Sequence, residues 1–151
     1  MVARELNNYT LALVDELRLP LVNRFYSECK YNVKCGRHDR VYSFTLDGKI
    51  IAAARLMLQP SNVYLLRNLC VSPEFRNQGV ASCFVKNILD DLAPQPCYCY
   101  ALPHLKDFYL ALDFTELTVE QVPQDIGETH LRNQLRKRGW LLMGFICHPA
   151  N

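Results

Sequence analysis

The chain has 151 residues, of which 50% are hydrophobic and 11% aromatic, enough apolar side chains to build one core without disulfide bridges. Its 17 basic and 15 acidic residues nearly balance, which excludes a disordered polyelectrolyte and argues against charge-driven binding to nucleic acid. Because no apolar run could span a membrane and residues 1–6 lack the apolar stretch of a secretory signal, we expect a cytoplasmic protein with a single domain over residues 1–151.

The first third of the chain has a helical pattern over Thr10–Leu19 and again over Pro20–Lys30, where Pro20 suits a first helical turn. The polar residues 31–40 predict a loop. Three strands then follow, the first two joined by the hairpin signal Asp47-Gly48, and they predict an antiparallel meander. These strands are Val41–Leu46, Ile50–Leu58 and Val63–Val71.

The apolar spacing changes to that of a helix after Gly79, and this helix is ended by Pro94 and Pro96. The next segment, Cys97–Leu102, is short and apolar and predicts a buried strand. A strand, a helix and a second buried strand imply a right-handed crossover into a parallel pair. The fold class is therefore α/β, with a mixed sheet in which an antiparallel meander runs into a parallel β-α-β crossover.

Four more elements are expected after the crossover: a short helix from Pro103, a strand, a helix closed by Gly139 and a last strand. The three longer ones are Phe114–Gln121, Asp125–Arg138 and Trp140–Cys147. The last strand is apolar and is the candidate contact of a homodimer.

Seven cysteines, an odd number, lie mostly within apolar runs, at positions 29, 35, 70, 83, 97, 99 and 147. In a reducing compartment we expect buried free thiols rather than a disulfide framework. Zinc binding is the alternative, and its candidate ligands are Cys35 and His38, or Cys97 and Cys99 with His104 or His148. Neither set has a partner at the spacing of a zinc finger, so we expect no metal site.

The segment of residues 70–81, between the third strand and the long helix, carries the clearest functional signal. A helix start presents unpaired backbone N–H groups and the positive end of the helix dipole, which together hold a phosphate or pyrophosphate. Gly79 permits close backbone approach, and the small Ala81 and Ser82 keep bulk away from the anion. Arg76 is placed to add a charge-assisted contact. The alternative is an ordinary loop with a glycine before a helix.

Residues 76–81, Arg-Asn-Gln-Gly-Val-Ala, resemble the Arg/Gln-x-x-Gly-x-Gly/Ala acetyl-CoA signature of the GNAT superfamily of N-acetyltransferases. About thirty residues later, Phe108–Phe114 resembles the Phe-Tyr-x-x-x-Gly-Phe segment of the same family. The two motifs come in the family's order and spacing, with the expected strands and helices between them. The resemblance covers Val41–Phe114 well and the two ends of the chain only loosely.

The resemblance implies the roles of individual residues. Backbone groups of Leu69, Cys70 and Val71 would line the pantetheine arm of acetyl-CoA, on a bulged strand that splays from the next to open a cofactor cleft. The pyrophosphate would be held by backbone N–H groups of Arg76, Asn77, Gln78, Gly79, Val80 and Ala81, with Ser82 assisting. Tyr109 falls on the position that protonates the departing CoA thiolate. The alternative for Tyr109 is a core aromatic on the apolar face of its helix.

Two positions depart from the family pattern. Asp113 stands in place of the glycine before Phe114, a change expected at the turn from helix to strand, and Leu102 stands in place of an asparagine that contacts pantetheine.

The general base is less defined, because the third strand carries Arg67 and Asn68 where some relatives have a glutamate. His104 is the candidate base because histidine is a common general base, with a polar role at its helix start as the alternative. Weaker candidates are Glu28, Glu116 and Tyr64.

The function implied is an acetyl-CoA-dependent N-acetyltransferase that moves the acetyl group directly to a primary amine of a small molecule or protein in a ternary complex. The alternative is a non-catalytic module that senses acetyl-CoA or CoA and binds a protein partner, favoured by the lack of an obvious carboxylate base. A nucleic-acid-directed enzyme would need a contiguous basic surface. The basic cluster of Arg132 and residues 136–138 fits instead a helix C-terminus, where cations complement the dipole, or a rim for an anionic group.

Overall fold

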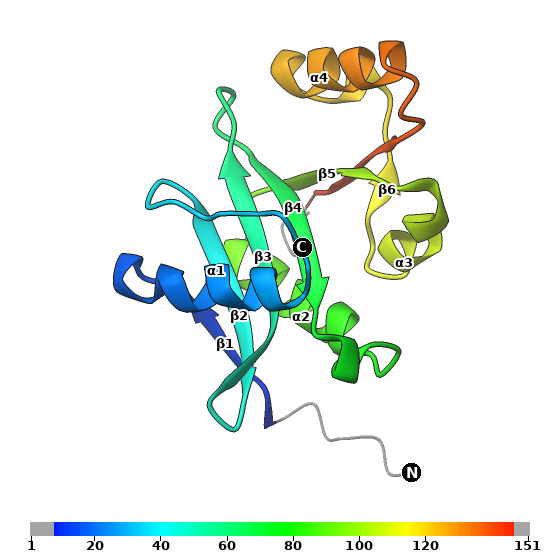
Figure 1. Ribbon diagram of the computed structural model, residues 1–151. Coiled ribbons are helices and arrows are strands. Elements are labelled where there is room, and N and C mark those ends of the chain that lie inside the picture. The colour runs from blue at the N-terminus through cyan, green and yellow to red at the C-terminus, as the bar shows by residue number, and fades with distance from the viewer. Residues whose placement is uncertain (1–7, 147–151) are drawn as a thin grey trace. The chain divides into compact units, whose positions relative to one another are not determined.

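The computed structural model describes residues 8–146, which fall into two compact units (Figure 1). The first unit combines the residues up to Met57 with Leu66–Asp91, and the second combines Leu58–Leu65 with the residues from Leu92 onward. Seven strands are ordered β1-β2-β3-β4-β5-β7-β6, and β4 begins in the second unit and ends in the first. The mixed α/β sheet is as expected. Within the described residues, no helix has the length and apolar character to cross a bilayer.

The meander of the first unit is confirmed. Its strands are β2 (Arg40–Leu46), β3 (Lys49–Leu58) and β4 (Tyr64–Val71). The chain reverses between β2 and β3 at Asp47 and Gly48, whose φ angles of 51° and 78° are those of the tight hairpin turn that this dipeptide favours.

The N-terminal segment differs from the prediction. Thr10–Leu13 forms strand β1, which pairs antiparallel with β2 from Thr10↔Thr45 to Leu13↔Tyr42. A single 3₁₀ turn, η2 (Glu16–Arg18), follows it. The predicted helix over Thr10–Leu19 is therefore wrong, because pairing with the edge of β2 satisfies the backbone and overrides a short helical pattern.

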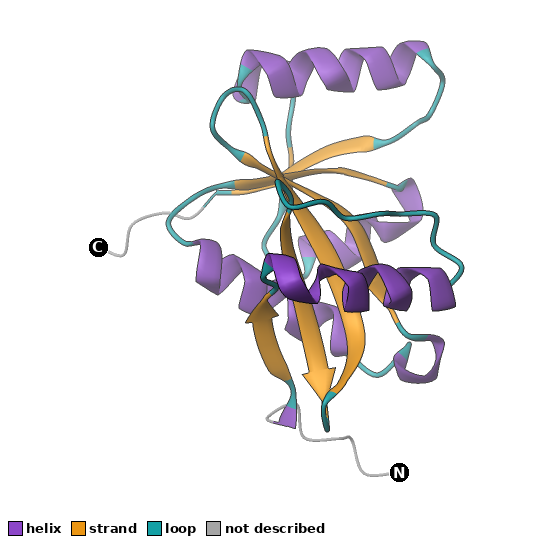
Figure 2. Cartoon of the chain, turned by 60° about the vertical axis from the view of Figure 1, so that its left-hand side comes forward, coloured by secondary structure: helices purple, strands orange, loops and turns teal. Residues whose placement is uncertain are grey.

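Two helices cover opposite faces of the first unit's sheet. Helix α1 (Leu19–Glu28) has Pro20 in its first turn, as expected, and packs Phe25 and Tyr26 into one core cluster with Val41. Phe44 lies on the other face, since neighbouring strand residues alternate sides, and its ring is 5.0 Å from that of Phe84 in α2 (Val80–Leu92). Figure 2 shows α1 crossing one face of the strands.

The second unit contains the parallel strand pair that the sequence predicts. Strand β5 (Cys97–Ala101) runs parallel to the start of β4, through the pairs Tyr64↔Cys97 and Leu65↔Tyr98. On its other side β5 pairs antiparallel with β7 (Leu141–Phe145). Leu65 of β4 and Tyr98 of β5 pack with Ile126 in one core cluster.

The strand predicted over Phe114–Gln121 is much shorter. Strand β6 is only Thr115–Glu116, and the 3₁₀ turn η5 (Val119–Gln121) follows it. A capping box between Thr118 and Gln121 starts this turn, with the Gln121 side chain accepting from the Thr118 N–H at 2.9 Å. These local hydrogen bonds replace the ladder that a longer strand would need.

Helix α4 (Gln124–Leu135) also ends earlier than predicted. Lys137, at a φ of 56°, reverses the chain, and the next N–H, of Arg138, donates to Asn133 O at 3.2 Å. Lys137 rather than Gly139 therefore closes the helix, through a Schellman motif.

Strand β7 is not a free edge. At Met143 and Gly144 it has β5 on one side and β6 on the other. The sequence predicts that this strand pairs with a second copy of the chain in a homodimer. That pairing is wrong at Met143 and Gly144, where both edges of β7 are already paired. Cys147, expected at its end, lies outside the described residues.

Candidate functional site

An exposed loop joins β4 to α2 in the first unit. It begins with the 3₁₀ turn η3 (Pro73–Phe75), and residues 76–79 are exposed between the buried side chains of Phe75 and Val80. Asn77 and Gly79 have left-handed φ angles of 61° and 77°. A Cβ atom built on Gly79 would meet no atom within 4 Å, so the space above the backbone is open. The loop thus presents its main chain to solvent.

The start of α2 leaves backbone donors unpaired. The first helical hydrogen bond comes from Cys83 N to Gly79 O, at 3.2 Å, and the N–H groups of residues 80–82 precede it. These N–H groups and the dipole of a 13-residue helix favour an anion at this end. The loop and helix start therefore fit a pyrophosphate without a charged side chain.

Two side chains brace the loop instead of extending from it. The Arg76 guanidinium donates from Nε to Val71 O at 3.0 Å, and Gln78 Nε2 donates to Glu74 O at 3.0 Å. Arg76 thus ties the loop to the end of β4, which is a structural role that the sequence did not indicate.

Strand β4 is irregular at Asn68, whose φ of 58° is left-handed inside a strand. The Tyr26 hydroxyl donates to Asn68 O at 2.7 Å, and Arg55 Nη1 donates to Asn68 Oδ1 at 3.1 Å. A left-handed residue interrupts the regular ladder, as in a β-bulge. It lies immediately before Leu69, Cys70 and Val71, so the three residues proposed to line pantetheine follow a fixed kink.

Arg55 connects this kink to a partly buried carboxylate. Its Nη2 lies 3.0 Å from Asp39 Oδ2, and the two side chains are only 17% and 16% exposed. Arg55 Nε is buried without a hydrogen-bond partner. We call the set of Tyr26, Asp39, Arg55 and Asn68 the bulge network. The sequence did not identify these residues as a group. The only signal was one arginine within the apolar strand Ile50–Leu58.

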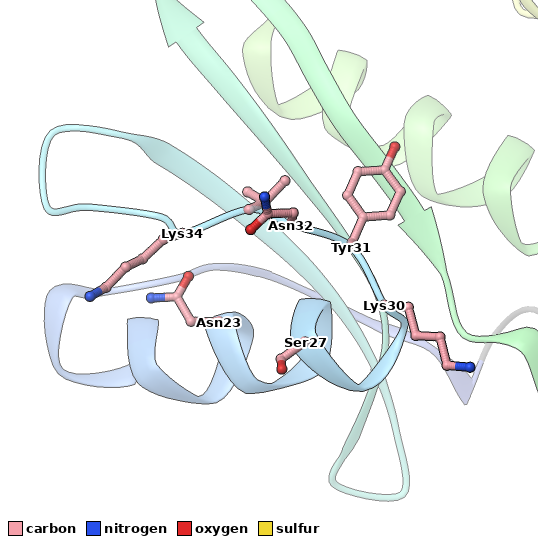
Figure 3. A pocket seen from close by; sticks show the side chains of 7 residues that line it. Asn23, Ser27, Lys30, Tyr31, Asn32 and Lys34 are labelled. Carbon is pink, nitrogen blue, oxygen red and sulfur yellow. The ribbon is translucent and has the colours of Figure 1, made fainter.

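The loop after α1 borders a surface depression of about 400 Å³, drawn in Figure 3. Tyr31 points from it toward β4, whereas Lys30 and Lys34 extend away. The Tyr31 ring centroid lies 5.7 Å from that of Tyr26. Burial raises the pKa of Tyr31, and the charge of a Cys70 thiolate would raise it further. Tyr31 is thus a residue beside β4 that sequence reasoning missed.

Cys70 is protonated at neutral pH. Burial raises the pKa of this thiol to about 12, and the neighbouring Cys29 thiol adds to the effect. A thiol that stays protonated is a poor nucleophile.

Tyr109 and His104 belong to the second unit. Tyr109 lies in α3 (Lys106–Leu110), is 6% exposed, and meets Phe108 and Phe114 edge-on at centroid distances of 5.0 and 5.1 Å. His104 is exposed in the 3₁₀ turn η4 (Pro103–Leu105). Tyr109 is therefore a packed aromatic with a single polar atom, and His104 is open to solvent.

The weaker base candidate Glu116 forms a surface ion pair with Lys106 at 3.4 Å. Glu28 is similarly paired with Arg24, at 3.2 Å.

Among residues 8–146, no three His, Cys, Asp or Glu side chains gather in a way that could hold a metal ion. The six cysteines within this described range are free thiols, and Cys35, Cys70, Cys97 and Cys99 are buried. His148, a zinc candidate from the sequence, lies outside the described residues.

The family model described as "Acetyltransferase (GNAT) domain" matches residues 37–116, more than half of the chain. The chain belongs to the GNAT acetyltransferase family. The match includes β2 to β6, the loop before α2 and the Phe108–Phe114 segment. A search of curated proteins finds no match.

Solved structures show the same fold at low sequence identity. The ribosomal-protein-S18-alanine N-acetyltransferase from Escherichia coli superposes with a TM-score of 0.64 at 16% identity, over 95% of this chain and 96% of that chain. Arabidopsis thaliana Naa50, in complex with the bisubstrate analogue CoA-Ac-MVNAL, gives 0.60 at 14%, over 91% and 98%. N-acetylglutamate synthase from Neisseria gonorrhoeae, with coenzyme A and N-acetyl-glutamate, gives 0.67 at 12%, over 93% of this chain and 35% of that chain.

Asp113 occupies the position where the family pattern has a glycine. Its φ of 67° is left-handed, a conformation that glycine adopts without steric cost and that aspartate tolerates better than most residues. The chain then turns back, with Phe114 N donating to Tyr109 O at 3.1 Å.

The left-handed conformation of Asp113 has a consequence for stability. Asp113→Val is expected to lower the free energy of unfolding by about 1–2 kcal/mol, because a β-branched residue is strained at this φ. Asp113→Gly should stay within about 0.5 kcal/mol of the parent, since relief of strain offsets the greater freedom of its unfolded chain. Urea unfolding of the two variants measures both values. Equal stability of the valine and glycine variants would contradict the assigned conformation.

Proposed function

We propose that the protein is an N-acetyltransferase that transfers the acetyl group of acetyl-CoA directly to a primary amine in a ternary complex. The observation that carries the proposal is the exposed, left-handed loop before α2, which follows a kinked β4 in a GNAT-family chain. Its open backbone fits the pyrophosphate of coenzyme A.

The chain's own residues would divide the work as follows. Backbone N–H groups of residues 76–81 hold the pyrophosphate, with Ser82 assisting, and backbone groups of residues 69–71 line the pantetheine arm. N–H groups of β4 polarise the thioester carbonyl, which bound acetyl-CoA supplies as the activated acyl group. Holding the amine and thioester together supplies much of the acceleration.

Two protons must move. His104 is the side-chain candidate to take the proton that the acceptor ammonium must lose before it attacks, either directly or through water. Tyr109 Oη gives its proton to the departing thiolate. The protonated Cys70 thiol takes no part as a nucleophile.

The acceptor class is an amine. Two of the similar structures bear names that describe acetylation of an alanine and a CoA–peptide bisubstrate analogue, which supports peptide N-termini beside small amines as acceptors to test.

A non-catalytic sensor of acetyl-CoA or CoA is the second candidate. One observation favours it: the kink of β4 carries Asn68, whose side-chain amide accepts from Arg55 and cannot serve as a base. Such a sensor would bind acetyl-CoA and a protein partner. Tyr109→Phe would change neither the binding of acetyl-CoA nor that of the partner.

The deciding experiment is turnover of acetyl-CoA against a panel of amines and peptides, read by mass spectrometry, with acetyl-CoA binding read by native mass spectrometry. We expect acetylated product from one amine class. Gly79→Val should weaken acetyl-CoA binding at least ten-fold, because valine is strained at a φ of 77° and fills the open loop. Gly139→Val is the matched control, since that glycine has a φ of 67° and equally open surroundings.

The control variant should bind acetyl-CoA like the parent. Binding without any product would favour the sensor. Neither binding nor product, in a folded protein, would refute both candidates.

A further inference from the structure

A cavity of about 350 Å³ lies in the second unit, lined by residues of β6 and η5, of α4 and of the start of β7. This volume is in the range of sites for small molecules. The side chains that matter to its chemistry are Glu116, Leu117, Glu120, His130, Leu131 and Trp140.

The charged lining side chains of this cavity are acidic. Glu116 and Glu120 line it, and no lysine or arginine among the described residues does. The Lys106 ammonium meets Glu116 at 3.4 Å, but both side chains are more than two-fifths exposed, so solvent screens the pair. The depression beside α1 has the opposite character, because Lys30 and Lys34 are its charged lining residues. Of these two hollows, the one beside α4 suits a cation.

The cavity also has an apolar wall. Leu117, Leu131 and Trp140 form part of it, and Leu131 is 47% exposed. The Trp140 ring already faces a cation, since the Arg138 guanidinium carbon lies 4.7 Å from its centroid. A ligand that carries both a positive charge and an apolar arm would match the acids and this wall together.

His130 is an independent sign of a site. Its side chain is 8% exposed yet lines the cavity, and its Nδ1 is buried with no hydrogen-bond partner. Buried polar atoms without partners are rare, and a bound water, ion or ligand is one explanation for each of them. The ring stacks parallel to Tyr100 at 6.3 Å, which fixes its plane. Burial lowers the pKa of His130 despite the opposing charge of Glu116, so the imidazole is neutral at pH 7 and does not repel a cation.

We propose that this cavity binds a small primary amine in its ammonium form, with the ammonium beside Glu116 and Glu120 and an apolar or aromatic arm along Leu131 and Trp140. The identification of this amine as an acetyl acceptor rests on the proposed function. The binding of the amine in the cavity does not rest on it. The acceptor class thereby narrows from any amine to apolar amines.

The single tryptophan of the chain, Trp140, lines the cavity and reports binding through its fluorescence. The probes are phenethylamine, the matched neutral phenethyl alcohol and the anion hydrocinnamate, titrated into the full chain at pH 7. We expect saturable binding of the amine, at least ten-fold tighter than that of the alcohol, and none of the anion.

Glu120→Gln should weaken amine binding at least five-fold and leave alcohol binding unchanged, since it removes only the charge of an exposed residue. Glu128→Gln is the matched control on α4, where Glu128 accepts from Gln124 at 2.8 Å and does not line the cavity. It should bind the amine like the parent.

Equal affinity for amine and alcohol, no saturable change, or equal effects of the two glutamine variants would overturn the proposed site. The acceptor assignment has its own test in the steady-state kinetics of acetyl transfer to phenethylamine, where Glu120→Gln should raise the Michaelis constant for the amine at least five-fold. An unchanged Michaelis constant would overturn that assignment and leave the proposed function standing. Amine binding with no acetyl transfer to any acceptor would support the cavity site and contradict the proposed function.

Discussion

Tyr109→Phe is expected to lower kcat for acetyl transfer by about 10²–10³-fold, while the KM for acetyl-CoA changes by less than about three-fold. The substitution removes one oxygen, the proposed proton donor to the thiolate. A group that acts only as the thiolate leaves affects the transition state and not the bound ground state. The measurement is steady-state kinetics at saturating amine.

Packing argues that this variant folds. Phe108 and Phe114 contact the Tyr109 ring edge-on, and phenylalanine keeps that ring. Tyr98→Phe is the matched control, because Tyr98 is a buried tyrosine of the same unit with no proposed catalytic role. It should retain the parent kcat. A similar kcat for parent and Tyr109→Phe would leave Tyr109 as a core aromatic, and equal losses in both variants would point to packing instead of proton donation.

The elements that sequence patterns predicted well are those whose signals are local. Asp47-Gly48 favours a tight hairpin turn through its own backbone preferences. The 3.6-residue period of apolar residues after Gly79 ends at prolines, which cannot continue a helix. The failures depend on distant partners or on competing local bonds. Thr10–Leu13 becomes a strand because β2 offers an edge some thirty residues later, and the strand after Phe114 is cut short by the Thr118 cap.

The residues of the candidate site also divide into those that local signals predict and those that depend on distant partners. The loop of residues 76–82 could be predicted because a glycine and a helix start are adjacent in the chain. The bulge network could not, since Tyr26 and Asn68 are 42 residues apart and Arg55 and Asn68 are 13 apart. Hydrogen bonds between residues so far apart in the chain produce no periodic pattern in a single sequence. Asp113 was identified from its motif, but only the structure shows that its φ is left-handed.

Arg55→Met is expected to lower the free energy of unfolding by about 2–3 kcal/mol, measured by urea denaturation. Methionine keeps much of the apolar volume but leaves the partly buried Asp39 carboxylate without its cation, with the Gly36 N–H as its remaining donor at 2.9 Å. The matched control is Arg24→Met, which breaks the exposed pair with Glu28 and should cost less than about 0.5 kcal/mol.

The double variant Arg55→Met, Asp39→Leu separates the ion pair from the kink. It removes both charges, so we expect it to regain at least about 1 kcal/mol relative to Arg55→Met alone. It still lacks the hydrogen bond from Arg55 to Asn68 Oδ1, and only Tyr26 then holds the left-handed residue. If this kink places the backbone of residues 69–71 for the thioester, kcat should stay at least ten-fold below that of the parent although stability recovers. Recovery of kcat along with stability would mean that Arg55 serves the fold alone and that Tyr26 suffices to shape β4.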